Sequence, residues 1–252
     1  MSNAVRAIYL SPHHDDVCFS LGALARKLGG VLINVFTVSS YTAALPYSSD
    51  PVVVSRIRDE EDRKFALNCG LTRYNLNQLD SPLRGRDPFD PTDLSAEVEL
   101  LRPILRHLIS RLAYASQRLL LFCPAGIGMH RDHLIVRGAA LAENSQKYQM
   151  VFYEELHYAA DKVQRERGLR DFLVATGQFN YSIRYKFGVS PEKLQLVQTY
   201  ASQFDKLPND LAAFIPADGS NIPHEAAWAN QPITIFESVG YLLRDMPKET
   251  IR

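Results

Sequence analysis

The stretch "VRAIYLSPHHDD", residues 5–16, decides the fold of this 252-residue chain. Its first half is a short apolar run typical of a buried strand, and its second half places two histidines and two aspartates where that run ends. Residues 16–28 then carry apolar side chains at helical spacing and are followed by two glycines, which predicts a helix. A strand that leads directly into a helix is typical of a sheet with parallel strands.

The same alternation continues to about residue 155. Together the segments predict an α/β fold with a Rossmann-like, doubly wound, mostly parallel sheet in the strand order 3-2-1-4-5. We expect a single domain over 1–252, with a core at 1–155 and a C-terminal extension at 156–252 that packs on it. The further strands are predicted at 31–38, 73–79, 118–124 and 150–155, and the further helices at 55–70 and 93–115. One more helix is indicated by the apolar stripe Leu134, Val136, Ala139 and Ala140.

The alternation fades in the extension. Residues 190–204 predict a helix, with Ser190 as the N-cap and Pro191 in its first turn. Residues 205–234 are expected to be mostly loop.

The charge balance excludes some partners. The 28 basic residues offset 28 acidic ones, so we expect no nucleic-acid partner.

No segment is long and apolar enough for a membrane span, and the N-terminus lacks the pattern of a secretory signal. Cys18, Cys69 and Cys123 are widely spaced and predict buried, reduced thiols. A cytoplasmic protein is therefore expected.

Two polar clusters should meet at one edge of the sheet. "PHHDD" follows the first strand and "HRDH" follows the fourth, and in the predicted order these strands are neighbours at the point where the order reverses. Ligands bind doubly wound sheets at that point. His13 and Asp16 are three positions apart, as are His130 and His133, so each pair can project to one side of a helix start.

This inventory favours a metal site over structural roles. A single aspartate after a strand is most often an N-cap, and a single histidine in a helix is most often packed or exposed. Two such clusters at neighbouring strand ends, however, would be costly to bury without a function. Catalytic zinc takes three protein ligands, and here more than three candidates are present, which leaves groups for proton transfer.

The paired motifs "PHHDD" and "GIGMHRDH" resemble the signatures (A/P)HPDD(E) and HxDH of the LmbE-like/PIG-L zinc N-deacetylases. Weaker similarities extend over most of the chain, through "RDEEDRKFALNCG", Asp80, "VFYEELHYA" and "YASQF". The resemblance implies a metal-dependent enzyme that removes the N-acetyl group from an N-acetylglucosamine-type amino sugar or conjugate. A homo-oligomer is compatible with this interpretation.

The resemblance also implies a role for each matching residue. One Zn²⁺ per chain, or another divalent ion, would be bound by His13, Asp16 and His133, with Asp15 as the general base toward the metal-activated water. His130 would be the cation that stabilises the oxyanion and protonates the leaving amine, and Asp132 would orient a histidine. The matching substrate-binding positions are Arg58 and Asp80. His14 and Val17 depart from the motif, because proline and glutamate are common there.

Two alternatives remain open at this stage. A receiver-like, Mg²⁺-dependent phosphoryl-handling domain would also use acidic residues after the first strand and Asp80, but it would have no need of the histidines. A non-catalytic sugar-binding protein on the same fold would not need Asp15.

Overall fold

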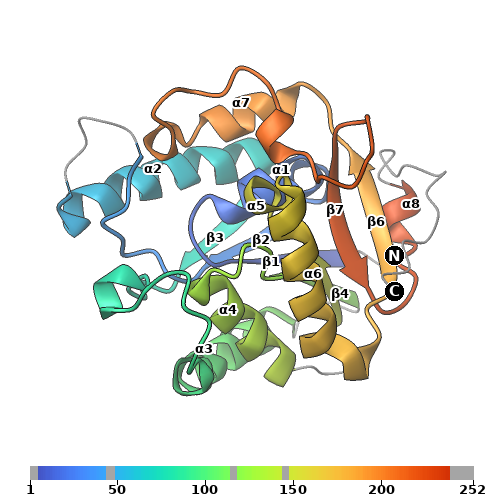
Figure 1. Ribbon diagram of the computed structural model, residues 1–252, viewed down its shortest axis with the longest axis horizontal. Helices are drawn as coiled ribbons and strands as arrows, with labels where there is room; N and C mark the ends of the chain where they lie inside the picture. The colour runs from blue at the N-terminus through green and yellow to red at the C-terminus, as the bar shows by residue number, and fades with distance from the viewer. Residues whose placement is uncertain (1–4, 44–48, 114–117, 144–147, 239–252) are drawn as a thin grey trace.

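The computed structural model describes residues 5–43, 49–113, 118–143 and 148–238. Its centre is one seven-stranded sheet in the order β3-β2-β1-β4-β5-β7-β6 (Figure 1). The first five strands along the chain are parallel, and the predicted order 3-2-1-4-5 is confirmed. The strands are β1 (Val5–Ser11), β2 (Gly30–Asn34), β3 (Leu71–Asn75), β4 (Arg118–Pro124), β5 (Gln149–Tyr153), β6 (Ile183–Gly188) and β7 (His224–Ala229).

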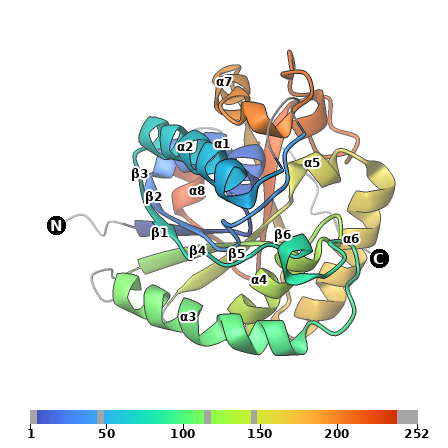
Figure 2. The ribbon, with the colours of Figure 1, turned by 90° about the vertical axis from the view of Figure 1, so that its left-hand side faces the viewer.

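Helices cover both faces of the sheet, as a doubly wound fold requires. In Figure 2, α1 (Asp16–Leu28) and α2 (Pro51–Cys69) lie on one face, and α3 (Ser95–Ala113) and α4 (Arg131–Ala142) lie on the other. Because α1 and α4 leave the sheet on opposite faces, the adjoining strands β1 and β4 frame a crevice at their carboxyl ends. The remaining helices are α5 (Leu156–Ala159), α6 (Lys162–Thr176), α7 (Glu192–Gln198) and α8 (Ile235–Ser238).

The interior strand β1 is apolar because both of its faces are covered. Ile8, Tyr9 and Leu10 are fully buried, and the three cysteines of the chain are also buried and free. Burial raises the pKa of the Cys123 thiol above its ordinary range, so this thiol behaves as a small apolar side chain. Within the described residues, no helix combines the length and apolar character needed to cross a bilayer.

A carboxylate from β7 stabilises an irregular turn of α1 by hydrogen bonds to its backbone. Leu21 has non-helical backbone angles, which interrupts the ladder of the helix. Glu225 accepts hydrogen bonds from the backbone N–H groups of Ala23 and Leu24 at 2.8 and 2.9 Å, and it also pairs with the buried ammonium of Lys193. The C-terminal extension thereby helps to hold the helix that begins at the motif "PHHDD".

The extension joins the sheet as well as packing on it. The strand β7 pairs antiparallel with β5 and with β6, in a region expected to be mostly loop. The helix α7 is shorter than the predicted 190–204, because the chain beyond it turns toward the first motif. There the hydroxyl of Tyr200 donates to the carbonyl of His14 at 2.9 Å, and Ser202 hydrogen-bonds to Glu61.

Candidate functional site

The loop between β1 and α1 is fixed by its own hydrogen bonds. The hydroxyl of Ser11 donates to the carbonyl of His13 and accepts from the backbone N–H of Val17. Asp16 accepts from the backbone N–H of His13 at 2.7 Å. These contacts present the side chains of His13, Asp15 and Asp16 at the end of the strand.

His13, Asp16 and His133 come together there as one group of possible metal ligands. Their ligand atoms lie within 4.8 Å of one another. Asp16 lies between the two rings, with one carboxylate oxygen 3.2 Å from Nδ1 of His13 and the other 3.3 Å from Nε2 of His133. Two imidazoles and one carboxylate are a ligand set that suits zinc. These are the three residues that the family resemblance implies as ligands.

Each of the two histidines is oriented by a second buried carboxylate. Asp132 lies 3.0 Å from Nε2 of His13, and Glu155 lies 3.1 Å from Nδ1 of His133. A carboxylate on the far nitrogen sets the tautomer and direction of a ligating imidazole. Asp132 thus contacts a histidine, as expected for its predicted role, and Glu155 is a partner that the sequence analysis did not identify.

A second group, His13, His130 and Asp132, is equally close, but its carboxylate is already engaged by hydrogen bonds. Asp132 accepts from the backbone N–H of Ser81 at 3.0 Å and from the guanidinium of Arg84 at 2.7 Å, besides contacting His13. The Nδ1 atom of His130 accepts from the backbone N–H of Asp132 at 3.2 Å and caps α4. Asp132 is therefore better suited to position its neighbours than to bind a metal ion.

Two carboxylates contact each histidine of the first group and raise its pKa. Burial lowers the pKa of His13, but its hydrogen bonds to Asp132 and Asp16 more than offset this effect and raise it to about 9. For His133, the charge of Asp16 and the hydrogen bonds to Asp16 and Glu155 outweigh burial and raise the pKa to about 10. The carboxylates that favour a proton on these two rings would equally favour a metal cation in its place, and these residues therefore suit a metal ion.

Asp15 stands beside this group, and its side chain is not used to cap the helix that it precedes. It is the N-cap residue of α1 but makes no side-chain capping hydrogen bond. One carboxylate oxygen accepts from the buried guanidinium of Arg58 at 2.8 Å, and Arg58 also donates to the hydroxyl of Ser39. The arrangement aims a carboxylate into the cavity and holds it there.

His130 has one ring nitrogen available to a substrate. Because Nδ1 accepts a backbone hydrogen bond, the neutral ring carries its proton on Nε2. Burial and then the positive charges of His13 and His133 lower the pKa of His130 to about 2 in the metal-free protein. The predicted cationic role of His130 thus requires that the ring gain a second proton once metal and substrate are bound.

These groups line a cavity of about 450 Å³, and both predicted substrate-binding residues, Arg58 and Asp80, lie in its wall. Asp80 is buried, with one carboxylate oxygen on the backbone N–H of Leu83. The lining also includes His157 and Tyr158, which the sequence analysis left without a role, and an aromatic wall formed by Phe19, Phe204 and Phe214. Burial and then the charges of Asp16 and Asp15 raise the pKa of Tyr158 above its ordinary range.

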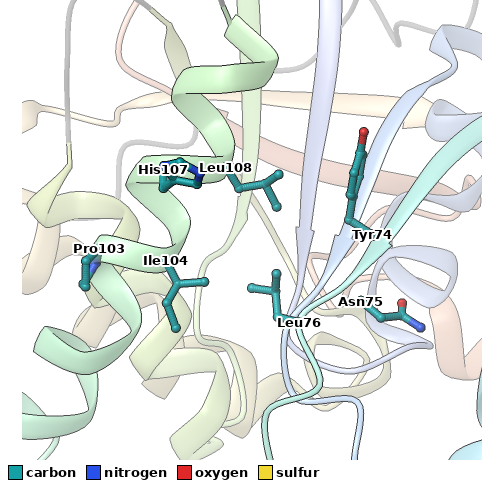
Figure 3. Close-up of a pocket in the computed structure, with 7 residues that line it drawn as sticks. All are labelled: Tyr74, Asn75, Leu76, Pro103, Ile104, His107 and Leu108. Atoms are coloured by element: carbon teal, nitrogen blue, oxygen red, sulfur yellow. The ribbon is translucent and has the colours of Figure 1, made fainter.

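A second cavity, of about 510 Å³, lies between β3 and α3 and is mainly apolar (Figure 3). Its lining includes His107 but none of the residues of the two motifs. The chemistry is therefore concentrated in the first cavity.

Comparisons with known proteins agree with this geometry. No family model matches the chain. The chain is 34% identical over 213 residues to 2'-N-acetylparomamine deacetylase of Streptomyces fradiae, which covers 79% of this chain and 74% of that protein. It resembles the crystal structure of a deacetylase of teicoplanin biosynthesis, with a TM-score of 0.61 and 21% identity over 88% of this chain and 96% of that chain. For the zinc-inhibited form of teicoplanin deacetylase, the TM-score is 0.60 and the sequence identity is 20%, over 88% of this chain and 97% of that chain. These two solved structures show the fold.

Proposed function

Since the chain belongs to the LmbE-like/PIG-L family of N-deacetylases, we propose that it is a zinc-dependent hydrolase that removes the N-acetyl group from an N-acetylglucosamine-type amino sugar or its conjugate. One observation carries the proposal. His13, Asp16 and His133 form a ligand set beside a carboxylate, Asp15, that has no capping role and faces the same cavity.

The metal would be held by His13, Asp16 and His133, whose far ring nitrogens are fixed by Asp132 and Glu155. When bound, zinc would polarise the amide carbonyl as a Lewis acid and lower the pKa of water, so that water can give up a proton and attack near neutral pH. Two imidazole nitrogens in the ligand set favour zinc over magnesium, which prefers oxygen ligands. This preference speaks against the receiver-like alternative.

Different side chains of the protein would accept and donate the protons of the reaction. Asp15, held by Arg58, would accept a proton from the attacking water. His130 would contact the substrate through Nε2 and pass a proton to the departing amine, so that the C–N bond breaks to give acetate and a free amino sugar. Arg58 and Asp80, in the cavity wall, would contact the sugar. A purely sugar-binding protein would have no use for Asp15.

The test is release of acetate by zinc-loaded protein from 2'-N-acetylparomamine, N-acetylglucosamine and N-acetylglucosamine glycosides. We expect hydrolysis of at least one of them, and abolition by a chelator with recovery on adding zinc. Hydrolysis that persists after complete removal of metal would refute the zinc mechanism. A zinc-loaded protein that releases acetate from none of these sugars would refute the proposed substrate class.

A further inference from the structure

The loop that connects β4 to α4 leaves room for an aromatic ring at Gly128. This glycine has φ of +92°, a conformation that other residues rarely adopt. A Cβ atom at this position would lie 2.3 Å from Cγ of Tyr158 and within 2.7 Å of both Cδ atoms. Real Cβ contacts are not that short, so the ring of Tyr158 can occupy this place only because residue 128 has no side chain.

The ring is tied to the metal ligands through Glu155. The carboxylate of Glu155 contacts Nδ1 of His133 and accepts from the backbone N–H groups of Gly126 and Ile127, in the loop beneath the ring. Its backbone carbonyl accepts from the N–H of Tyr158 at 3.0 Å. One residue therefore sets the position of a ligand, of the loop at Gly128 and of the segment that carries Tyr158.

Aromatic neighbours hold the ring from several other sides. Its centroid lies 4.1 Å from that of His157, 5.9 Å from that of His133 and 6.5 Å from that of Phe89. Such packing restricts the ring to one orientation at the cavity wall.

The hydroxyl of Tyr158 is a hydrogen-bond donor without a protein acceptor. Within the described part of the chain, no group hydrogen-bonds to it. It nevertheless lies within electrostatic reach of Asp16 and Asp15, the proposed metal ligand and general base. A phenol is protonated at neutral pH, so its O–H is available to an acceptor that enters the cavity.

An amide under attack by water provides such an acceptor, because negative charge develops on its carbonyl oxygen. A preorganised donor aimed at that oxygen stabilises the transition state more than the bound substrate. We propose that Tyr158 is a further catalytic residue, whose hydroxyl donates a hydrogen bond to the substrate's amide oxygen as it becomes an oxyanion, and that Gly128 is the positioning residue that gives its ring room. The phenol keeps its proton throughout, so it makes and breaks no covalent bond.

The inference rests on the proposed deacetylation, and Tyr158→Phe tests it by removing one oxygen atom. With the N-acetyl sugar that the wild type hydrolyses, we expect kcat to fall about 10²–10³-fold with KM and bound zinc unchanged. The matched control is Tyr181→Phe, which changes a buried ring that packs on Phe152 and Phe172 outside the cavity and should keep the wild-type kcat. A Tyr158→Phe enzyme with the wild-type kcat, or with only KM raised, would overturn the role.

A double-mutant cycle tests the part of Gly128. Gly128→Ala should displace the ring and lower kcat in the wild-type background, but it should cost little further kcat when Tyr158 is already Phe. Equal losses in both backgrounds would overturn the positioning role. If the wild type releases acetate and Tyr158→Phe does so equally fast, this inference fails while the proposed function stands. If the wild type hydrolyses no N-acetyl sugar, the proposed function fails and this role fails with it.

Discussion

Asp15, as a single residue, illustrates how the proposed site would separate metal binding from proton transfer. It adjoins the candidate ligand Asp16 but contacts Arg58 instead of the candidate ligand atoms. Asp15→Asn should therefore lower kcat about 10²–10⁴-fold while zinc stays bound, because only the base is lost. His13→Ala should instead lose zinc. Metal content measured beside kcat distinguishes the two, and loss of zinc from Asp15→Asn would contradict this division.

The protonated histidines of the metal-free site predict how metal affinity depends on pH. The pKa values of His13 and His133, about 9 and about 10, lie above their ordinary value, so at pH 7 both rings carry the proton that zinc must displace. Apparent zinc affinity should rise between pH 6 and pH 8, by up to about 100-fold per unit if both protons are released. Competition with a chelator, corrected for the chelator's own titration, measures this slope. An affinity independent of pH would contradict it.

Glu155 offers a test of the carboxylates behind the ligands. Glu155→Gln keeps an oxygen for only one of the backbone N–H groups of Gly126 and Ile127, which bond to different carboxylate oxygens, and it removes the charge beside His133. Zinc affinity should fall about 10–100-fold. Glu60→Gln, on the exposed face of α2, is the matched control and should leave it unchanged. An unaltered affinity in Glu155→Gln would mean that this contact does not tune the ligand.

The family resemblance carried by the motifs predicted the candidate ligand group that the structure brings together, but it missed part of the surroundings of that group. His13, Asp16 and His133 form a recognisable pattern because they lie in short motifs at neighbouring strand ends. Glu155 and Tyr158 lie one strand further along, in "EELHYA", where a single acidic or aromatic residue has no diagnostic spacing. The available signal was their position after a predicted strand that ends at the same edge of the sheet.

Helices and strands were predicted correctly where the local sequence marks them, and they were missed where distant contacts determine them. The helix predicted at 16–28 is α1, because an apolar stripe and a terminal glycine mark both of its ends. The strand β7 reads "HEAAWA", whose alanines carry little β-propensity, and its burial depends on neighbours that the local sequence does not reveal. The end of α7 was likewise set by distant contacts of Tyr200 and Ser202.

A substitution of Glu225 would measure how much the contact between β7 and α1 contributes to stability. Glu225→Ala would leave the ammonium of Lys193 buried without its partner and the N–H groups of Ala23 and Leu24 without acceptors. We expect a loss of about 3–5 kcal/mol in the free energy of unfolding, measured with urea. Adding Lys193→Met should restore part of the loss, since no unpaired charge then remains. Full stability in Glu225→Ala would show that α1 tolerates its irregularity without this support.

At the scale of the whole molecule, we propose that residues 1–252 form a single domain, because buried charges connect the extension to the core. Glu154, which follows β5, pairs with Arg165 of α6 and with Arg184 of β6, and it accepts from the indole of Trp228 in β7. Within the described residues, three elements of the extension, α6, β6 and β7, thus contact a carboxylate of the core. Removing the extension would therefore leave a buried carboxylate without its partners.

The same network predicts sensitivity to acid. Burial raises the pKa of Glu154, but the charges of Arg184 and Arg165 outweigh burial and lower it from 4.5 to about 2. Because the folded-state pKa is depressed, this pairing stabilises the protein fully above about pH 4.5, and the contribution of about 3 kcal/mol is lost as pH falls toward 2. Glu154→Gln should be less stable at pH 7 and should lose less stability on acidification. Parallel stability–pH curves for the two proteins would contradict this prediction.

The position of β7 has a consequence for synthesis on the ribosome. It lies between β5 and β6 in the sheet but follows both in the chain. A nascent chain that has emerged only as far as β6 therefore holds a strand whose neighbour has not yet left the ribosome. Completion of the sheet must wait until residue 229 is outside the ribosome, and prematurely terminated products should be recognised by proteases because they display unpaired strand edges.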